Sequence, residues 1–165
     1  IVNDELTELT SKNISSFLSH QKKGGLDWII LMELQNDQIL SAAWNSSFLK
    51  RISFVGLEEL FNNEMMFDIT INHSILQVDL ISRKVLISQL KKILKAAPQL
   101  KILHVKNLNR HMIEFIAINH LNISTLFYEH IDEEVNEVYM NLIKSCDING
   151  VNAKIKLIQK SFWRI

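Results

Sequence analysis

Histidine is the residue type in this chain best suited to bind a metal ion or to transfer a proton near neutral pH. A zinc site on a helix needs two histidines in an H-x-x-x-H or H-E-x-x-H arrangement, because that spacing places both rings on one helical face. No pair has this spacing, and His111 and His120 flank one expected helix on different turns. We therefore expect no metal site and no cofactor. The histidines are His20, His73, His104, His111, His120 and His130.

Nucleophilic and acid–base catalysis have equally little support. Cys146 falls in the apolar stripe of an expected helix, where a thiol is more often a small core residue than a nucleophile. Glu133, Glu134 and Glu137 suit the solvated start of that helix. The chain has no G-x-S-x-G motif and no phosphate-binding loop, and it contains only 4 glycines. These patterns predict that the protein is not an enzyme and has no catalytic residues.

The composition is that of a single globular domain. The chain has 165 residues, of which 47 % are hydrophobic and 22 % are charged, and this is enough apolar material for a core. No stretch reaches the roughly 18 apolar residues of a membrane helix, so we expect no membrane contact. The single cysteine excludes an intramolecular disulfide and indicates an intracellular compartment, cytoplasmic or nuclear. Because the chain begins with Ile1 rather than Met, we expect a fragment of a longer protein.

Charge is unevenly distributed along the chain, although the net charge is zero. Residues 1–82 carry 5 basic and 11 acidic side chains, whereas residues 83–165 carry 13 basic and 7 acidic ones. The stretch 83–110 has eight basic residues and no acidic one, and such asymmetry can guide an acidic partner. Binding of an acidic partner or of nucleic acid through this stretch is one alternative function. Nucleic acid is the less favoured ligand, because no recognition helix, zinc ligand set or RNA-binding aromatic motif accompanies the lysines.

A repeated apolar pattern organises the chain. Leu100, Leu103, Val105 and Leu108 have the spacing L-x-x-L-x-L-x-x-L, and the same slots recur in both directions. Other matches are Leu26, Ile29, Leu31 and Leu34; Leu49, Ile52, Phe54 and Leu57; Ile75, Val78 and Leu80; Ile123, Leu126, Tyr128 and Ile131; and, less completely, Ile1, Leu6 and Leu9, and Ile155 and Leu157. The pattern predicts seven units in one domain, 1–165, beginning near residues 1, 26, 49, 75, 100, 123 and 152.

Each unit changes from the period of a strand to the period of a helix. Alternation at Leu103 and Val105 directs two side chains to one face of a short strand. We expect Asn109 and Asp37 to cap helices and Pro98 to end one. The apolar stripes of two expected helices are Leu86, Leu90, Ile93, Leu94 and Ala97, and Val135, Val138, Tyr139, Leu142, Ile143 and Cys146. One such unit cannot bury its own apolar face, so neighbouring units must stack.

The stretch from Ile75 to Leu108 resembles a leucine-rich repeat. Its spacing is similar to that of the intracellular kinds, as in F-box substrate receptors, ribonuclease inhibitor and NLR receptors, and the phrase ILKAAPQLKIL is especially similar to the helix-to-strand joints of F-box repeats. The resemblance implies an α/β solenoid, or horseshoe, with a parallel sheet on the concave side and helices on the convex side. It also implies a scaffold or substrate-recognition domain. The similarity to F-box repeats further implies that this domain belongs to a ubiquitin-ligase adaptor.

One slot departs from that family. Leucine-rich repeats usually carry Asn or Cys in the ninth position, where the side chain satisfies backbone groups of the loop. This position here holds Leu9, Leu34, Leu57, Arg83, Leu108, Ile131 and Lys160. The polar ladder of the family is therefore missing from this chain.

The alternative fold is a doubly wound α/β sheet, which would give an enzyme-like domain with a small-molecule site. That fold also alternates strands and helices, but its units usually need about 30 or more residues. A nucleotide-binding version would also need a glycine-rich turn after the first strand, and none is present. Strand order distinguishes the two folds, because a solenoid requires sequential neighbours and a doubly wound sheet requires a reversal.

The resemblance places the residues between the core slots on the concave face, and from them we predict a site for another protein. The predicted binding residues are Trp28, Ile30, Met32, Arg51, Val55, Ile81, Ile102, His104, Lys106, Phe127 and Glu129. Further outward positions are Ser53, Gln77, Asp79, Thr125, Lys154, Lys156 and Ile158. The segment 28–32 is apolar on both faces, which indicates either a partner site at the N-terminal strands or cover by a flanking segment or another domain.

Overall fold

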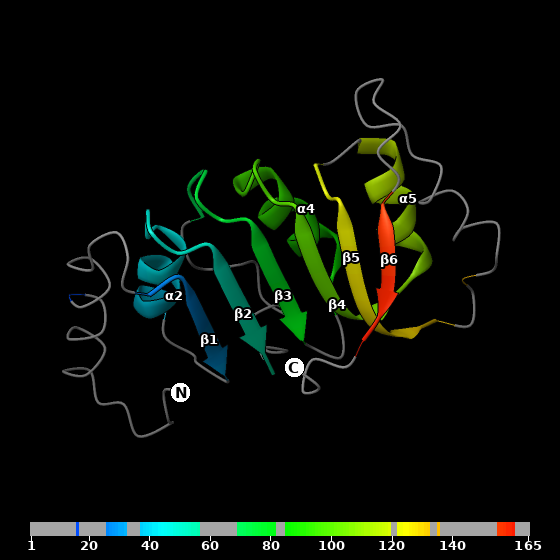
Figure 1. Ribbon diagram of the computed structural model, residues 1–165, viewed down its shortest axis with the longest axis horizontal. Helices are drawn as coiled ribbons and strands as arrows, with labels where there is room; N and C mark the ends of the chain where they lie inside the picture. Colours follow the sequence, from blue (N-terminus) through cyan, green and yellow to red (C-terminus); the bar gives the residue numbers. More distant parts are fainter. Residues whose placement is uncertain are drawn as a thin grey trace.

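The computed structural model describes residues 16, 26–32, 37–56, 69–81, 85–119, 122–132, 135 and 155–160. In these segments a helix follows the first, third and fourth strands, and no described helix separates the second strand from the third or the fifth from the sixth (Figure 1). The strands are β1 (Trp28–Met32), β2 (Arg51–Val55), β3 (Gln77–Ile81), β4 (Ile102–Leu108), β5 (Thr125–Ile131) and β6 (Lys156–Gln159). The helices are α2 (Asp37–Trp44), α4 (Ile87–Ala96) and α5 (Arg110–Asn119).

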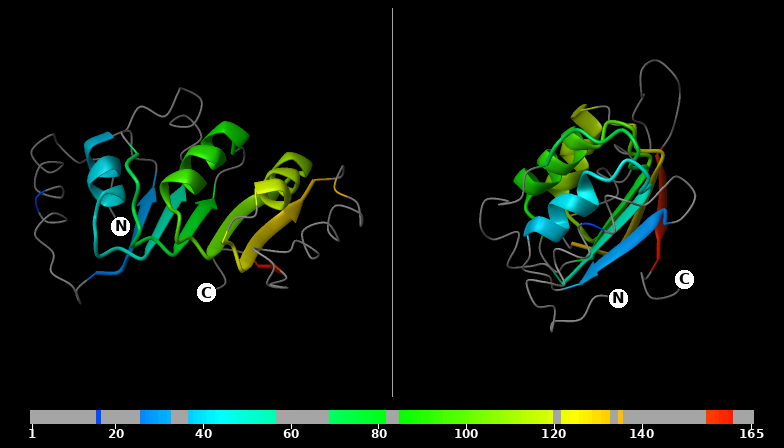
Figure 2. Two further views of the ribbon diagram at one scale, coloured as in Figure 1. Left: turned by 90° about the horizontal axis from the view of Figure 1, so that it is seen from above. Right: turned by 90° about the vertical axis from the view of Figure 1, so that its left-hand side faces the viewer.

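The six strands form one parallel sheet in the order β1-β2-β3-β4-β5-β6. Helices α2, α4 and α5 all lie on the same face of this sheet, as the two side views show (Figure 2). The expected α/β class with a parallel sheet is therefore confirmed. The order of the described strands contains no reversal, so this part of the chain lacks the crevice that a reversal creates in a doubly wound sheet.

A backbone pattern repeats where the strands begin. The carbonyl of Lys50 accepts hydrogen bonds from the N–H groups of Leu76 and Gln77, at 2.8 and 3.0 Å. The carbonyls of Asp27, Leu76 and Lys101 accept two N–H groups in the same way, and the carbonyl of Ser124 accepts the N–H of Lys156. Each of these carbonyls belongs to the second residue of a predicted unit, so the starts of consecutive strands are aligned across the sheet.

The apolar slots of neighbouring units meet in register across the sheet. Ile52 pairs with Val78, which pairs with Leu103 in turn, and Leu103 pairs with Leu126. Every second residue of a strand consequently faces the helices, as the period of two requires. This alternation fixes which side chains build the core and which lie on the other face.

The last strand departs from the expected alignment by two residues. Leu157 pairs with Leu126, and Gln159 pairs with Tyr128. The sequence pattern instead placed Ile155 and Leu157 in these two slots, and this placement is wrong. The physical reason is that polar Gln159 occupies a slot at the edge of the described sheet, where an apolar residue is not required, and matching of apolar residues cannot find it.

The core lies between the sheet and the three helices. Side chains with no exposed surface include Leu31, Ile52, Val78, Leu80 and Leu103 from the strands and Ile39, Trp44, Leu90, Ile93 and Ile113 from the helices. The indole Nε1–H of Trp44 donates to the carbonyl of Thr70 at 2.8 Å, so its polar group is satisfied inside the core. Burial of one such side chain contributes about 1.5–3 kcal/mol, which makes this layer the main source of hydrophobic stabilisation.

Helix ends follow local sequence signals. The Oδ1 atom of Asn109 accepts the N–H of Met112 at 2.9 Å, which is the geometry of an N-cap, so this prediction is confirmed. Helix α4 begins after Leu86, whose N–H donates to Oε1 of Gln89 at 2.9 Å. The same helix ends at Ala96, and Pro98 follows as expected.

Asparagine side-chain amides form hydrogen bonds between successive segments that connect a helix to the next strand. The buried Asn72 donates from Nδ2 to the carbonyls of Trp44 and Ser46, at 2.5 and 2.9 Å. Asn122 donates from Nδ2 to the carbonyl of Pro98 at 3.0 Å. Backbone groups of these joints are thus satisfied by amides before the strands begin. In the ninth position, at the end of β4, Leu108 is fully buried and packs as an apolar residue instead.

Some sequence-based predictions concern segments outside the described residues. They are the first unit, the ninth-position residues Leu34, Leu57 and Arg83, the outward Lys154, the histidines His20 and His120, and the helix start with Glu133, Glu134 and Glu137 that leads to Cys146. Among the helices that the structure describes, none is long and apolar enough to span a membrane.

Candidate protein-binding face

The strand residues that alternate with the core form a second face of the sheet, which we call the outer face. It is turned away from α2, α4 and α5 (Figure 2). The predicted binding residues all lie on it: Trp28, Ile30 and Met32 on β1, Arg51 and Val55 on β2, Ile81 on β3, Ile102, His104 and Lys106 on β4, and Phe127 and Glu129 on β5. Their role in binding stays a prediction.

The outer face is not uniformly accessible. Val55 and Ile81 are only 9 % and 5 % exposed, and they form a small apolar cluster against which Trp28, Ile30 and Met32 pack. Val55 and Ile81 therefore differ from the exposed contact residues that we expected, because their own neighbours pack against them. The three residues of β1 remain partly exposed and can still contact a partner.

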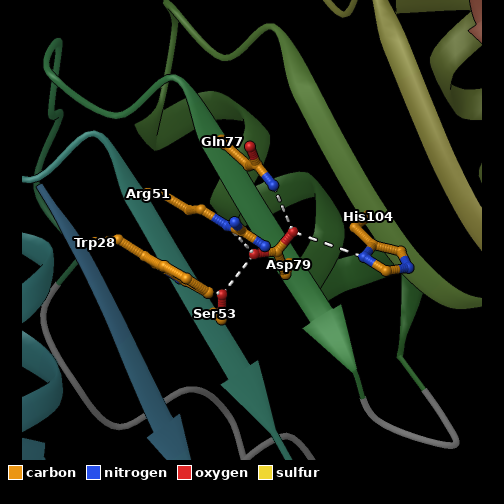
Figure 3. Close-up of polar contacts among 6 residues, drawn as sticks. All are labelled: Trp28, Arg51, Ser53, Gln77, Asp79 and His104. Atoms are coloured by element: carbon orange, nitrogen blue, oxygen red, sulfur yellow. Dashed lines mark hydrogen bonds and ion pairs between the residues drawn. The ribbon is translucent and has the colours of Figure 1, made fainter. Parts of the chain in front are cut away.

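A buried aspartate organises the polar part of the outer face (Figure 3). Asp79 has no exposed surface. Its Oδ2 atom accepts hydrogen bonds from Nε of Arg51 at 2.7 Å and from Oγ of Ser53 at 2.5 Å. Its Oδ1 atom accepts Nε2 of Gln77 at 2.9 Å. A buried carboxylate is stable only when it is paired and hydrogen-bonded, and these contacts from two strands meet that requirement.

Arg51 and Trp28 lie against each other above the strands, and both side chains extend toward Asp79 (Figure 3). The guanidinium carbon of Arg51 is 3.9 Å from the centroid of the Trp28 ring, within the range of a cation–π contact. The indole Nε1–H of Trp28 donates to Oγ of Ser53 at 2.9 Å. Since Ser53 in turn donates to Asp79, a single carboxylate fixes both large side chains.

His104 continues the network onto β4. Its Nδ1 atom lies 3.7 Å from Oδ1 of Asp79, and its ring centroid lies 5.8 Å from that of Phe127. Burial of the imidazole lowers the pKa of His104 below its ordinary value of 6.5, and the carboxylates of Asp79 and Glu129 oppose this shift without cancelling it. The ring is therefore mainly neutral near pH 7, which suits its contact with Phe127.

The sequence places the network residues at outward positions but does not reveal that they interact. Ser53, Asp79 and His104 each occupy the fifth position of a predicted unit, and the sheet register places them side by side. Comparison of that position across units would have put an aspartate between a serine and a histidine. The presence of an aspartate did not by itself predict a buried contact, because an aspartate at an outward strand position is usually solvated.

The basic stretch 83–110 is divided between different surfaces. Lys92 and Lys95 are exposed on α4, whereas Lys106 lies on the outer face. Arg110 pairs with Glu114 at 2.7 Å on α5. In the part of this stretch that the structure describes, the basic residues do not form one continuous surface.

Other candidate sites have little support in the described segments. His73, His111 and His130 are exposed, and no group of three or more His, Cys, Asp or Glu residues in these segments could hold a metal ion. A depression of about 450 Å³ is lined by Asn45, Ser47, Thr70, Ile71, Asn72, His73 and Ser74. These residues precede β2 and β3, whereas ligands of open α/β sheets bind beyond the carboxyl ends of the strands.

Comparison with known proteins does not assign a family or a function to the chain. No protein-family model matches the chain, and no curated protein or solved structure is significantly similar to it. The candidate site is therefore defined by its own features, namely the fixed Trp28–Arg51 pair, the buried Asp79 and the aromatic Phe127 on one face of a parallel sheet.

Proposed function

We propose that this domain recognises another protein through the outer face of its sheet. The observation that carries the proposal is the stacked pair of Trp28 and Arg51, which Asp79 holds in place directly and through Ser53. Tryptophan and arginine are among the residues that most often dominate binding energy at interfaces. Because both side chains are already immobilised, a partner that packs on them loses little further conformational entropy.

The proposal includes a leucine-rich-repeat solenoid with the outer face on its concave side. The sequential strand order and the repeated carbonyl pattern at the strand starts support it, since each unit of a solenoid contacts only its neighbours. Through the F-box resemblance, the proposal extends to a scaffold or to substrate recognition in a ubiquitin-ligase adaptor.

The enzyme-like alternative has less support. A small-molecule site in a doubly wound sheet requires a reversal of strand order, and the described strands have none. The depression between residues 45–47 and 70–74 lies at the amino ends of the strands, opposite to the end where such sites form.

Affinity capture with matched variants tests the proposal. The outer-face variant combines Trp28→Glu and Phe127→Glu. The control combines Ser88→Glu and Asn119→Glu, which add the same charge at exposed positions on α4 and α5. Circular dichroism must first show that both variants fold.

We expect the wild type and the control to capture the same proteins and the outer-face variant to lose them, because two carboxylates would be desolvated against the partner. Retention of those proteins by the outer-face variant, or their equal loss from both variants, would place recognition elsewhere.

A further inference from the structure

Arg51 has hydrogen-bonding capacity that the described residues do not use. Its side chain is 23 % exposed, and its Nε atom donates to Asp79. Its two Nη groups donate to no acceptor among the described residues. A guanidinium offers five N–H donors in a planar fork that matches a carboxylate. Trp28 and Asp79 fix the orientation of this fork, so it is prepared for an anionic group supplied from outside.

The charge that reaches the surface of the outer face is mainly positive. Lys156 and Lys160 are exposed, and Lys106 is partly exposed. Of the acidic side chains described on this face, Asp79 is fully buried beside Arg51, and Glu129 is partly exposed. An acidic partner therefore complements this face, and the same charges would accelerate its association.

The geometry of the sheet sets the spacing of the contacts. Arg51, Gln77, Ile102, Thr125 and Lys156 form one row across the strands. Arg51 and Lys156 are four strand spacings apart, which is about 19 Å at about 4.8 Å per strand. An extended chain covers that distance in about six residues.

An apolar contact lies between the two ends of this row. Phe127 is in the neighbouring row on β5, and Nζ of Lys160 is 5.7 Å from the centroid of its ring. Ile102 and Ile158 lie on the strands to either side of Phe127. A peptide can place an apolar side chain here between two acidic ones, so a protein segment can satisfy the charged and the apolar positions together.

We infer that the outer face binds an acidic protein segment that crosses the strands, with two carboxylates about six residues apart and an apolar residue between them. One carboxylate binds the Nη groups of Arg51 beside Trp28. The apolar residue packs on Phe127, and the second carboxylate binds Lys156 and Lys160. This inference rests on the proposed function and specifies the chemistry of the partner.

Selection from a phage-displayed library of random peptides, each about twelve residues long, tests the inference. We expect the selected peptides to be enriched in Asp and Glu at the spacing above, and their amide-substituted versions to lose binding. Arg51→Lys is expected to weaken binding of the selected peptides about tenfold, because it keeps the positive charge beside Asp79 but removes the planar guanidinium fork. Lys156→Gln should weaken peptide binding about twofold to threefold. Lys92→Gln, which removes one charge on the helix side, should leave binding unchanged.

Different outcomes separate this inference from the proposed function. Selected peptides that require Trp28 and Phe127 but show no acidic enrichment would overturn the inference and leave the proposed function intact. A single-stranded oligonucleotide of about twelve nucleotides that displaces the peptides and binds more tightly would overturn both, because the outer face would then recognise nucleic acid rather than protein. Selection of peptides unaffected by the Trp28→Glu, Phe127→Glu variant would overturn both, whereas failure to select any peptide would overturn the inference alone, because a folded partner can still bind the outer face.

Discussion

The two faces of this sheet are built from alternate residues of the same strands, yet they depend on different interactions. On the helix side, Ile52, Val78 and Leu103 follow one another across three strands with no exposed surface. On the outer face, the corresponding row contains Ser53, Asp79 and His104, which are also buried but are polar. The first row is held by the transfer of apolar surface out of water. In the second row, Ser53 donates a hydrogen bond to the Asp79 carboxylate, and His104 Nδ1 lies 3.7 Å from it.

This difference separates stability from recognition. Apolar packing tolerates substitution by residues of similar volume, and it does not indicate which ligand a surface binds. A buried carboxylate permits few arrangements of its partners, so Asp79 fixes Arg51 and Trp28 in one geometry. The two faces should therefore respond differently to substitution.

The largest effect is expected from a matched pair of phenylalanines. Phe54 on the helix side is 2 % exposed, so Phe54→Ala should lower the free energy of unfolding by about 3–5 kcal/mol. Phe127 lies half-buried on the outer face, so Phe127→Ala should cost less than half as much. Urea denaturation measures both. Equal losses would mean that the outer face is a second core rather than a presented surface.

The next effect concerns the ion pair of Arg51 and Asp79. Asp79→Ala leaves the guanidinium without its partner and should cost about 2–3 kcal/mol, which is less than for a fully buried pair because Arg51 reaches solvent. Adding Arg51→Gln to this variant should cost much less than Arg51→Gln does alone. A double-mutant cycle should give a coupling of about 0.5–3 kcal/mol. Additive losses would show that Asp79 does not hold Arg51.

A smaller effect should appear as a dependence on pH. Burial lowers the pKa of His104 in the folded state below 6.5, so the unfolded chain binds more protons than the folded chain just below that pH. Stability should therefore fall as the pH decreases through 6.5 toward the folded pKa. Urea midpoints of the wild type should fall more steeply in this window than those of His104→Gln. Parallel pH profiles for the two proteins would contradict a buried, neutral His104.

The smallest effect is expected at a helix end. Asn109→Ala removes the acceptor for the N–H of Met112 and should cost about 1 kcal/mol, whereas Asn109→Asp should retain most of the stability. Asn122→Ala, at an exposed bond to the Pro98 carbonyl, should cost less. The prediction concerns the helix layer, so peptide binding at the outer face should be unchanged. A loss of binding in Asn109→Ala would couple the two faces.

The apolar slots and the helix signals could be predicted because they depend on short-range patterns. The alternation at Leu103 and Val105, the cap at Asn109 and the position of Pro98 follow from local period and backbone chemistry. The position of β6 could not be predicted, because its slot holds Gln159 and its alignment depends on pairing with β5. Register in a weakly apolar strand is set by the neighbouring strand.

The candidate site was predictable in position but not in interactions. An outward position on a strand identifies a face, and Trp28, Arg51 and Phe127 were named on it for that reason. Hydrogen bonds from Arg51 and Ser53 to Asp79 join residues 26 to 28 positions apart, so they depend on the relative register of two units. The burial of Val55 and Ile81 likewise depends on side chains of a neighbouring strand.

Site-specific photo-crosslinking tests the central claim most directly. Benzoylphenylalanine replaces Phe127 on the outer face in one protein and the exposed Lys92 on α4 in another. Both are irradiated with a partner isolated by affinity capture or with a selected peptide. Recognition through the outer face predicts covalent adducts from position 127 and none from position 92. Adducts from position 92 without adducts from position 127 would contradict it and assign binding to the helix side.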